Sequence, residues 1–219
     1  MAVTRQSNAR TANGDAASII LPGGAMVDWT IACWVRGLTV NKRFVVVGVT
    51  DAAFPVVELK RAGGVIVATV VNDAEGETTI AAAVDLEAGW NHVALVSDGI
   101  GAAQLYVQGE LEGEDAPTGT FAAGSFVMAG DDQGDAPDFD LAHLAIWDRA
   151  LSADEVSSIF TAGRTHDLRE NTGDYTGGED GPAHWWPGDG LFKGMVLDRG
   201  LIATSPMNLV GEARTRREA

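Results

Sequence analysis

The sequence predicts an all-β fold, an antiparallel two-sheet jelly-roll sandwich with one short helix at about residues 152–162. Three observations predict it. Apolar and polar residues alternate with a period of two through many short segments, which is the pattern of strands. Turn residues such as Pro22-Gly23-Gly24 and Gly63-Gly64 separate these segments at short intervals. Helical spacing of apolar residues marks the one segment that is expected to form the helix.

The strands are short and follow one another along most of the chain. In chain order, they are expected at residues 18–21, 30–35, 44–49, 56–59, 65–71, 78–85, 91–97, 103–108, 126–129 and 140–147. The strands at 91–97 and 103–108 form a predicted hairpin, because the residues from Ser97 to Gly101 (SDGIG) favour tight turns. Gly109 ends the second of these strands, and residues 110–114 are expected to lead out of the hairpin.

Residues 152–162 carry the signals of a capped helix. Ser152 is an N-cap residue, and Glu155 follows three positions later, which is the capping-box pattern. Gly163 fits the position just after the last turn, where glycine is favoured. One face of the helix is apolar and carries Val156, Ile159 and Phe160. The helix is therefore expected to begin after Ser152 and to end before Gly163.

Several sequence motifs resemble one family. They are T-I-A-C-W-V at residues 30–35, W-N-H-V-A-L-V at 90–96, L-Y-V-Q-G at 105–109 and A-I-W-D-R-A-L-S-A-D-E-V at 145–156. Together they resemble the laminin-G-like family, which has the jelly-roll fold of pentraxins and concanavalin A, and they are similar to members found in bacteriophage virion proteins. The resemblance covers about residues 18–163. It implies a binding scaffold rather than a catalyst, although a fold does not fix a function.

The domain organisation follows from the change in composition along the chain. Residues 1–17 are expected to be a polar arm, and residues 18–163 the jelly-roll domain. Residues 164–219 begin as a Gly-rich loop and continue into strands that resemble the opening segment of laminin-G-like domains. These last strands are expected either to complete the sandwich of their own chain or to pair with the sheet edge of a neighbouring subunit.

The distribution of charge is uneven. The formal net charge is −16, and residues 62–148 contain sixteen acidic residues but no Lys or Arg. Such a surface repels nucleic acid and anionic lipid, so neither is expected as a partner. The basic residues expected to make subunit contacts lie near the two ends: Arg5, Arg10, Arg214, Arg216 and Arg217. They are either solvated tails or the complement of an acidic face on a neighbouring subunit of a homo-oligomer.

The sequence shows no membrane or export signal. No apolar run approaches the ~20 residues needed to cross a bilayer, and residues 1–17 lack the apolar region of a secretory signal. Cys33 is the single cysteine, so no intrachain disulfide forms, and it is expected in the core. The expected location is a virion assembled in the host cytoplasm.

Catalysis finds little support in the sequence. Glycanases of this fold need two carboxylates, about 5 to 5.5 Å apart in retaining enzymes. Glu110, Glu112 and Glu114 alternate as such a pair would, but the E-x-D-x-x-E pattern of those glucanases is absent and the site is the exit of a hairpin. Cys33 and His92 are a conceivable pair, yet Cys33 lies in an apolar strand. The protein is therefore expected not to be an enzyme.

One loop is rich in potential calcium ligands. Residues 129–140 (AGDDQGDAPDFD) include Asp131, Asp132 and Asp135, and carboxylates on a Gly-containing loop suit Ca²⁺. Relatives often carry a G-x-I-D-x-V pattern before the R-A-L-S element. Here the matching positions are Phe139, Leu141 and Ala142, so both the Gly and the Asp of the pattern are missing. The loop is either solvated or holds a cation, and no other cofactor is expected.

Carbohydrate binding would need exposed aromatic rings that stack on sugars. Trp34, Trp90 and Trp147 lie in strand motifs and are expected in the core. The candidates for exposure and stacking are Trp29, Trp185 and Trp186. Trp185 and Trp186 are adjacent, so on a strand they would point to opposite faces.

Three functions are compatible with these observations. The main expectation is a non-enzymatic structural or decoration protein of a phage head or tail, which contacts other virion proteins and copies of itself. The alternative is a carbohydrate-binding adhesion module with a glycan as ligand. A glycan hydrolase is the third reading, and the missing acid motif argues against it.

Overall fold

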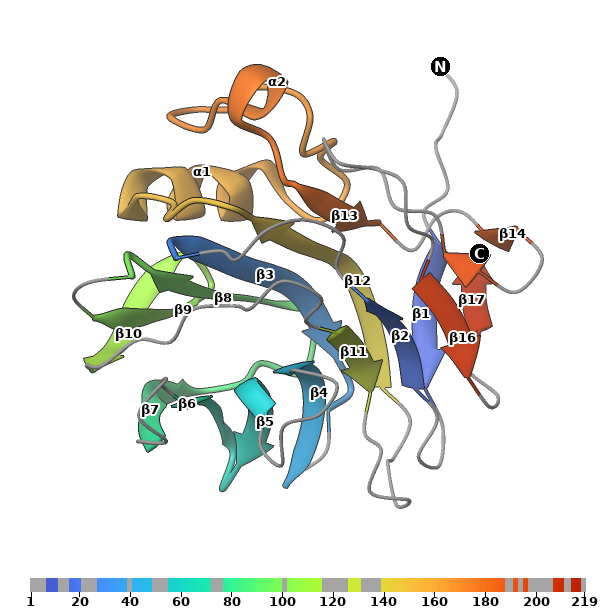
Figure 1. Cartoon of the computed structure of the whole chain (residues 1–219), viewed down its shortest axis with the longest axis horizontal. Helices are drawn as coiled ribbons and strands as arrows, with labels where there is room; N and C mark the ends of the chain where they lie inside the picture. Colours follow the sequence, from blue (N-terminus) through green and yellow to red (C-terminus); the bar gives the residue numbers. More distant parts are fainter. Residues whose placement is uncertain are drawn as a thin grey trace.

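Two antiparallel β-sheets face each other, and a helix covers the outer face of one of them (Figure 1). The structure is a computed structural model that describes residues 7–11, 16–20, 27–38, 41–48, 55–71, 77–99, 102–115, 126–130, 139–187, 191–192, 195–196, 207–210 and 214–217. The predicted all-β, two-sheet sandwich with one short helix is confirmed. Among the described residues, no helix combines the length and apolarity that crossing a membrane requires.

The first sheet, here called sheet A, contains eight strands. Their order across the sheet is β10 (Glu110–Asp115), β9 (Ala103–Val107), β8 (Asn91–Ser97), β3 (Trp29–Arg36), β12 (Phe139–Trp147), β1 (Ser7–Thr11) and β17 (Arg214–Arg217). The eighth strand, β13 (His184–Trp186), also pairs with β12. Strand β12 therefore has β3 on one side and, on the other, β1 followed by β13.

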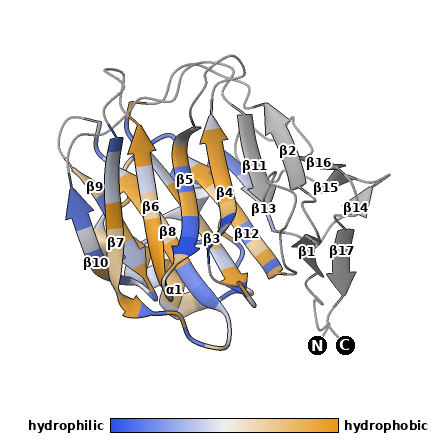
Figure 2. Ribbon diagram, turned by 90° about the horizontal axis from the view of Figure 1, so that it is seen from below, coloured by the Kyte–Doolittle hydropathy of each residue, from blue (hydrophilic) through white to orange (hydrophobic). Residues whose placement is uncertain are grey.

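The second sheet, sheet B, contains nine strands. Their order is β14 (Leu191–Phe192), β15 (Met195–Val196), β16 (Met207–Val210), β2 (Ala16–Ile20), β11 (Phe126–Gly130), β4 (Lys42–Gly48), β5 (Pro55–Ala62), β6 (Val65–Val71) and β7 (Glu77–Asp85). Figure 2 looks at the molecule from the side of sheet B, where β4 and β6 are mainly hydrophobic and β5 includes a hydrophilic stretch.

The core between the sheets is built from alternate residues of the facing strands. Ile31, Cys33 and Val35 of β3 point inward, and Val57 and Leu59 of β5 meet them from sheet B; all five are fully buried. Burying each large aliphatic side chain contributes about 1.5–3 kcal/mol. The expectation that Cys33 is a core residue is confirmed, and burial raises the pKa of its thiol far above the ordinary range.

A second apolar cluster lies on the outer face of sheet A, beneath helix α1 (Ala153–Ala162). Val156 and Ile159 of the helix pack on Trp147 of β12, and Tyr175 from the following loop joins them. The Trp147 indole N–H donates to the Tyr175 hydroxyl at 3.3 Å, and that hydroxyl donates to the Leu168 carbonyl at 2.6 Å. Strands β3, β8 and β12 are therefore buried on both faces, which explains their nearly continuous apolar sequences.

Helix α1 has the predicted boundaries. The Ser152 hydroxyl accepts from the Glu155 N–H at 3.2 Å, and the Glu155 carboxylate accepts from the Ser152 N–H at 2.9 Å, which completes the capping box. The Gly163 N–H donates to the carbonyls of Ile159 and Phe160. Arg149 joins the strand end to the helix through two contacts with Glu155, of 3.0 and 2.6 Å. A second helix, α2 (Gly177–Asp180), is a single turn.

Strand β10 differs from the expectation that residues 110–114 merely lead out of the hairpin. A turn at Gln108 and Gly109, with φ of 54° and 82°, sends the chain back along β9. Only glycine fits the second position, because a Cβ there would lie 2.8 Å from the Phe160 ring. The pairing includes a bulge between Leu111 and Gly113.

Strands also lie near both ends of the chain. Residues 1–17 include β1, which pairs with β12 and β17, and the start of β2. The strands after residue 183 pair within the same chain: β13 with β12, β16 with β2, and β17 with β1. The division of the chain into an arm, a domain and a C-terminal completing segment stays a prediction.

Candidate functional site

The three tryptophans expected to be exposed are buried. Trp29, Trp185 and Trp186 are 0%, 2% and 2% exposed, so none offers a ring face on which a sugar could stack. The expectation of exposure is wrong because β3 and β13 lie inside the layered structure. Trp186 packs in the core between the sheets, and Trp185 packs in the cluster beneath the helix. The prediction that adjacent tryptophans face opposite sides is confirmed.

Half of the other predicted site residues lie outside the described part of the chain. Asp131, Asp132, Asp135 and Arg5 lie outside the described residues. Arg10 is placed in β1, whereas Arg214, Arg216 and Arg217 are placed in β17. In the described part of the chain, no group of three His, Cys, Asp or Glu side chains could hold a metal ion.

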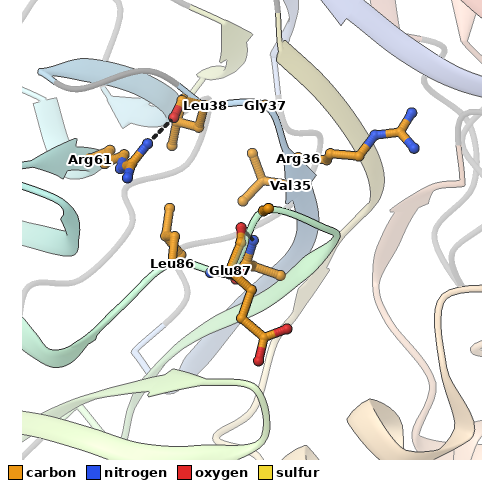
Figure 3. Close-up of a pocket in the computed structure, with 9 residues that line it drawn as sticks. Val35, Arg36, Gly37, Leu38, Arg61, Leu86 and Glu87 are labelled. Carbon is orange, nitrogen blue, oxygen red and sulfur yellow. Dashed lines mark hydrogen bonds between the residues drawn. The ribbon is translucent and has the colours of Figure 1, made fainter.

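The clearest hollow among the described residues is a groove at one end of the sandwich, here called the rim groove (Figure 3). It has a volume of about 530 Å³ and opens where β3 and β5 end and where the chain passes from β7 to β8. Its lining consists of Val35, Arg36, Gly37, Leu38, Arg61, Leu86, Glu87, Ala88 and Asn91. Grooves of this size suit small ligands.

The floor of the rim groove is apolar. Val35 is the last inward residue of β3 and is fully buried, and Leu38 just beyond the strand is 4% exposed. Leu86, which follows β7, packs against the same core from the other sheet. Val35 and Leu38 close the end of the inter-sheet core, and the half-buried Leu86 is the one of the three that offers apolar surface to a ligand (Figure 3).

Arg61 is the cationic group of the groove. Its Nη1 donates to the Leu38 carbonyl at 2.6 Å, and its Nε donates to the Gly64 carbonyl at 3.2 Å. These two bonds fix the guanidinium against β3 and the β5–β6 turn. They use two of its five N–H groups, and the others are donors that a ligand can engage.

Asn91 shapes the opposite rim. Its side-chain oxygen accepts from the Glu87 N–H at 2.9 Å, and its amide donates to the carbonyls of Glu87 and Gly89, each at 3.0 Å. The asparagine of the W-N-H motif therefore holds the turn that carries Glu87 and Ala88. Both of these rim residues are exposed.

Arg36 contributes to the groove differently, because its side chain points away from Arg61 and Leu38 (Figure 3). The guanidinium donates to an Asp140 carboxylate oxygen at 3.0 Å and 2.5 Å. It also lies 4.7 Å from the centre of the half-buried Trp90 ring, which a second guanidinium, from Arg164, approaches at 4.5 Å. Trp90 is thus covered by cations, an arrangement that stabilises the loop after α1 against sheet A.

Two buried histidines lie on the outer face of sheet A, away from the groove. His92 packs between Trp34 and Phe160, and burial lowers its pKa to about 4. His143 packs on Trp185, and burial, followed by the nearby Arg164 charge, lowers its pKa to about 3. Both rings have structural positions beneath the helix and the loop that follows it.

A polar surface separate from the rim groove lies on the outer face of sheet B. No helix covers this face in the described part of the chain. Glu58 of β5 forms ion pairs with Lys60 at 2.9 Å and with Arg43 of β4 at 3.4 Å. Next to it, the Thr69 hydroxyl is buried without a hydrogen-bond partner among the described residues. Strands β4, β5 and β6 carry one carboxylate, Glu58, across this face.

Sequence reasoning did not identify the groove residues. Val35, Leu38 and Leu86 have the character of core residues, and they meet because three separate chain segments end at one rim. Arg61 carries a signal that could have drawn attention, because it is the last basic residue before the acidic stretch from residue 62 to 148.

The comparison with family models identifies this fold. The model of the concanavalin A-like lectin/glucanases superfamily matches residues 12–157, more than half of the chain. No curated protein sequence matches the chain at a significant level.

Solved structures give the same result at low sequence identity. The heptameric SAP-like pentraxin of Limulus polyphemus has a TM-score of 0.61 and 17% identity, with 95% of this chain and 98% of that chain covered. A protein of Bacteroides ovatus, provisionally assigned as carbohydrate-binding, has a TM-score of 0.64 and 14% identity, with 97% of this chain and 60% of that chain covered. The receptor binding domain of botulinum neurotoxin D has a TM-score of 0.61 and 13% identity, with 74% of this chain and 45% of that chain covered. At these identities the likeness shows the fold alone.

Proposed function

Because the chain belongs to the concanavalin A-like lectin/glucanases superfamily, we propose that it is a non-enzymatic carbohydrate-binding module that holds a glycan in the rim groove. The observation that carries this proposal is the combination of an apolar floor with a fixed guanidinium in one groove. A sugar ring has an apolar C–H face and a ring of hydroxyl groups. The half-buried Leu86, which lies over the buried Val35 and Leu38, fits the first, and the remaining N–H donors of Arg61 fit the second.

The same groove argues against glycoside hydrolysis. Hydrolysis of a glycosidic bond needs two carboxyl groups on either side of the scissile bond. Among the described residues that line the groove, Glu87 is the single carboxylate. It can accept a hydrogen bond from a sugar hydroxyl, but it has no partner acid there. We therefore expect the protein to bind a glycan and release it unchanged.

The expectation of a virion structural protein stays a prediction. The similar structures include a provisionally assigned carbohydrate-binding protein and a toxin receptor-binding domain, and these fit the carbohydrate-binding alternative better. A glycan-binding module carried on a particle would satisfy both expectations. Co-purification of the protein with particles would test that combination.

A blocking variant tests the groove directly. Ala88→Trp adds a large ring at the exposed rim without removing a core contact, so it should fill the groove and leave the fold intact. The matched control is Ala83→Trp, at an exposed position on the outer face of β7. On a glycan array followed by calorimetry, Ala88→Trp should lower affinity at least about tenfold, or ~1.4 kcal/mol, and Ala83→Trp should not.

Two results would contradict the proposal. One is a wild-type protein that binds no glycan on a broad array. The other is an Ala88→Trp variant that binds as the wild type does. If Ala83→Trp loses binding instead, the ligand lies on the outer face of sheet B near β7 and not in the rim groove. Chromatography of each bound glycan after prolonged incubation should show no cleavage products, and turnover would make the protein an enzyme.

A further inference from the structure

Arg61 of the rim groove is a half-buried guanidinium that has no carboxylate partner among the described residues. Other described arginines have one at ion-pair distance: Arg36 with Asp140, Arg43 with Glu58, Arg149 with Glu155 and Arg169 with Asp167. Arg61 instead donates to two backbone carbonyls, which carry no net charge to balance its own. Its positive charge is therefore open to an anionic group of a ligand.

The two backbone bonds hold the guanidinium but leave most of its donors unused. They engage Nε and one N–H of Nη1, so both N–H groups of Nη2 and the second one of Nη1 have no acceptor among the described residues. A planar guanidinium can donate two parallel hydrogen bonds to the two oxygens of a carboxylate. Because Arg61 is already held in place, a ligand does not have to order its side chain.

The charge of Arg61 lies next to the apolar surface of the groove. The Gly64 carbonyl accepts both from Nε of Arg61 at 3.2 Å and from the Leu86 N–H at 3.4 Å, which makes the guanidinium and Leu86 neighbours. In the view of Figure 3, the guanidinium of Arg61 lies above Leu86. One ligand can therefore place an anionic group on Arg61 and C–H groups on Leu86.

The acidic residues near the groove do not neutralise Arg61. Figure 3 shows the Glu87 carboxylate pointing away from it. Asp85 lies beside the β5–β6 turn, where a Cβ at Gly64 would be 2.9 Å from its carboxylate, but it forms no ion pair with Arg61 and does not line the groove. The net charge of −16 disfavours anions at long range, yet exposed charges more than about 8 Å apart are largely screened at physiological salt. The local charge at Arg61 is therefore positive.

We propose that the glycan of the rim groove is acidic, and that one of its sugar rings carries a carboxylate that binds Arg61. This inference rests on the proposed function and names the class of sugar that the groove selects. Uronic acids and sialic acids have this chemistry, because each joins a carboxylate to a ring with an apolar C–H face. The carboxylate accepts hydrogen bonds from the unused donors of Arg61, and the C–H groups contact Leu86. A neutral sugar leaves the charge of Arg61 without a counter-ion.

Matched pairs of glycans test the carboxylate on the wild-type full chain. Calorimetry at physiological salt compares oligosaccharides of glucuronic or galacturonic acid with the same oligosaccharides of glucose or galactose, and a sialylated oligosaccharide with its desialylated form. The acidic member of at least one pair should bind at least about tenfold more tightly, since a hydrogen bond to a charged group contributes that much. Tighter binding of a 6-sulfated counterpart would overturn the carboxylate as the recognised group.

The substitution Arg61→Gln tests the residue, and the readout is the ratio of the affinities for the acidic and the neutral glycan. This ratio should fall to about one in Arg61→Gln, because the charge that distinguishes the two ligands is gone. A merely structural role of Arg61 would weaken both affinities and keep their ratio. Lys60→Gln is the matched control, because it makes the same change in net charge on the other face of β5, where Lys60 pairs with Glu58. It should keep the wild-type ratio.

The outcomes separate this inference from the proposed function. If the wild type binds both members of every pair equally, or if Arg61→Gln keeps the wild-type ratio, the inference is wrong and glycan binding itself stands. If no glycan binds at all, both are wrong. Circular dichroism should show that each variant is folded, and the wild-type comparison decides the matter even if Arg61→Gln does not fold.

Discussion

His143 lies where the neighbour of β12 changes from one strand to another. Residues Phe139 to Leu141 pair with β1, and Leu144 to Ile146 pair with β13, with an irregularity in between. His143 takes up this change with a φ of 50°, a conformation that few non-glycine residues adopt. Its ring packs 5.4 Å from the Trp185 ring, so the strained backbone is held by burial.

Buried neutral histidines make stability depend on pH. The pKa of His92 is lowered from 6.5 to about 4 in the folded protein because burial disfavours the charged imidazolium. Between about pH 6.5 and about pH 4 the unfolded chain therefore binds a proton that the folded protein does not. This contribution is fully present above pH 6.5, and it is lost as the pH falls through that window.

The substitution His92→Leu should flatten this dependence, because leucine has no proton to bind. One pKa unit corresponds to about 1.4 kcal/mol. As the pH falls from about 7 to about 4, the free energy of unfolding of the variant should therefore rise by on the order of 2–3 kcal/mol relative to that of the wild type. Urea unfolding of both proteins at a series of pH values measures this difference in the free energy of unfolding. The difference at pH 8 gives the effect of the substitution that does not depend on pH. Equal slopes for the two proteins would show that His92 does not titrate differently on folding.

At the scale of the elements, periodicity predicted the strands well where both the pattern and the burial were strong. The hairpin of β8 and β9 matches the expected residues because its sequence alternates and its loop carries turn residues. Strand β10 was missed because its sequence, ELEGED, is acidic and contains Gly113, and its extended state comes from pairing with β9. Strands β1 and β17 were missed for the same reason, since neither has an apolar periodicity.

The candidate site was less accessible from the sequence than the fold. Leu38 and Leu86 are separated by forty-eight positions, and nothing local distinguishes a leucine at the groove floor from one in the core. The tryptophans failed as candidates for a related reason. Their exposure depends on how many layers cover a strand, and a chain segment does not show how many layers will pack on it.

The capping box of α1 gives a prediction at this scale. Ser152→Ala removes the hydroxyl that accepts from the Glu155 N–H, and loss of such a cap lowers the free energy of unfolding by about 1 kcal/mol. Ser157→Ala is the matched control in the middle of the same helix, where alanine favours the helix. It should leave stability unchanged or slightly higher. Chemical denaturation compares the two variants. An equal loss of unfolding free energy in both would show that the cap contributes nothing specific.

At the scale of the whole molecule, the segment after α1 is part of the sandwich. The family model ends at residue 157, yet β13 adds Trp186 to the core between the sheets and Trp185 to the cluster beneath the helix. One short strand therefore ties both layers of the protein together. The indole of Trp186 stacks on His184 of the same strand, with ring centres 5.7 Å apart.

Trp186→Ala should therefore destabilise the entire fold. Removing a buried aromatic side chain costs about 3–5 kcal/mol, a large part of the 5–15 kcal/mol that is typical of folded domains. Trp90→Ala should cost less, because that ring is half-buried and contacts two guanidiniums. Urea unfolding followed by near-ultraviolet circular dichroism measures both. A buried ring cannot be removed without weakening the sheets that enclose it. If Trp186→Ala kept wild-type stability but lost glycan binding, Trp186 would therefore belong to the binding surface and not to the core.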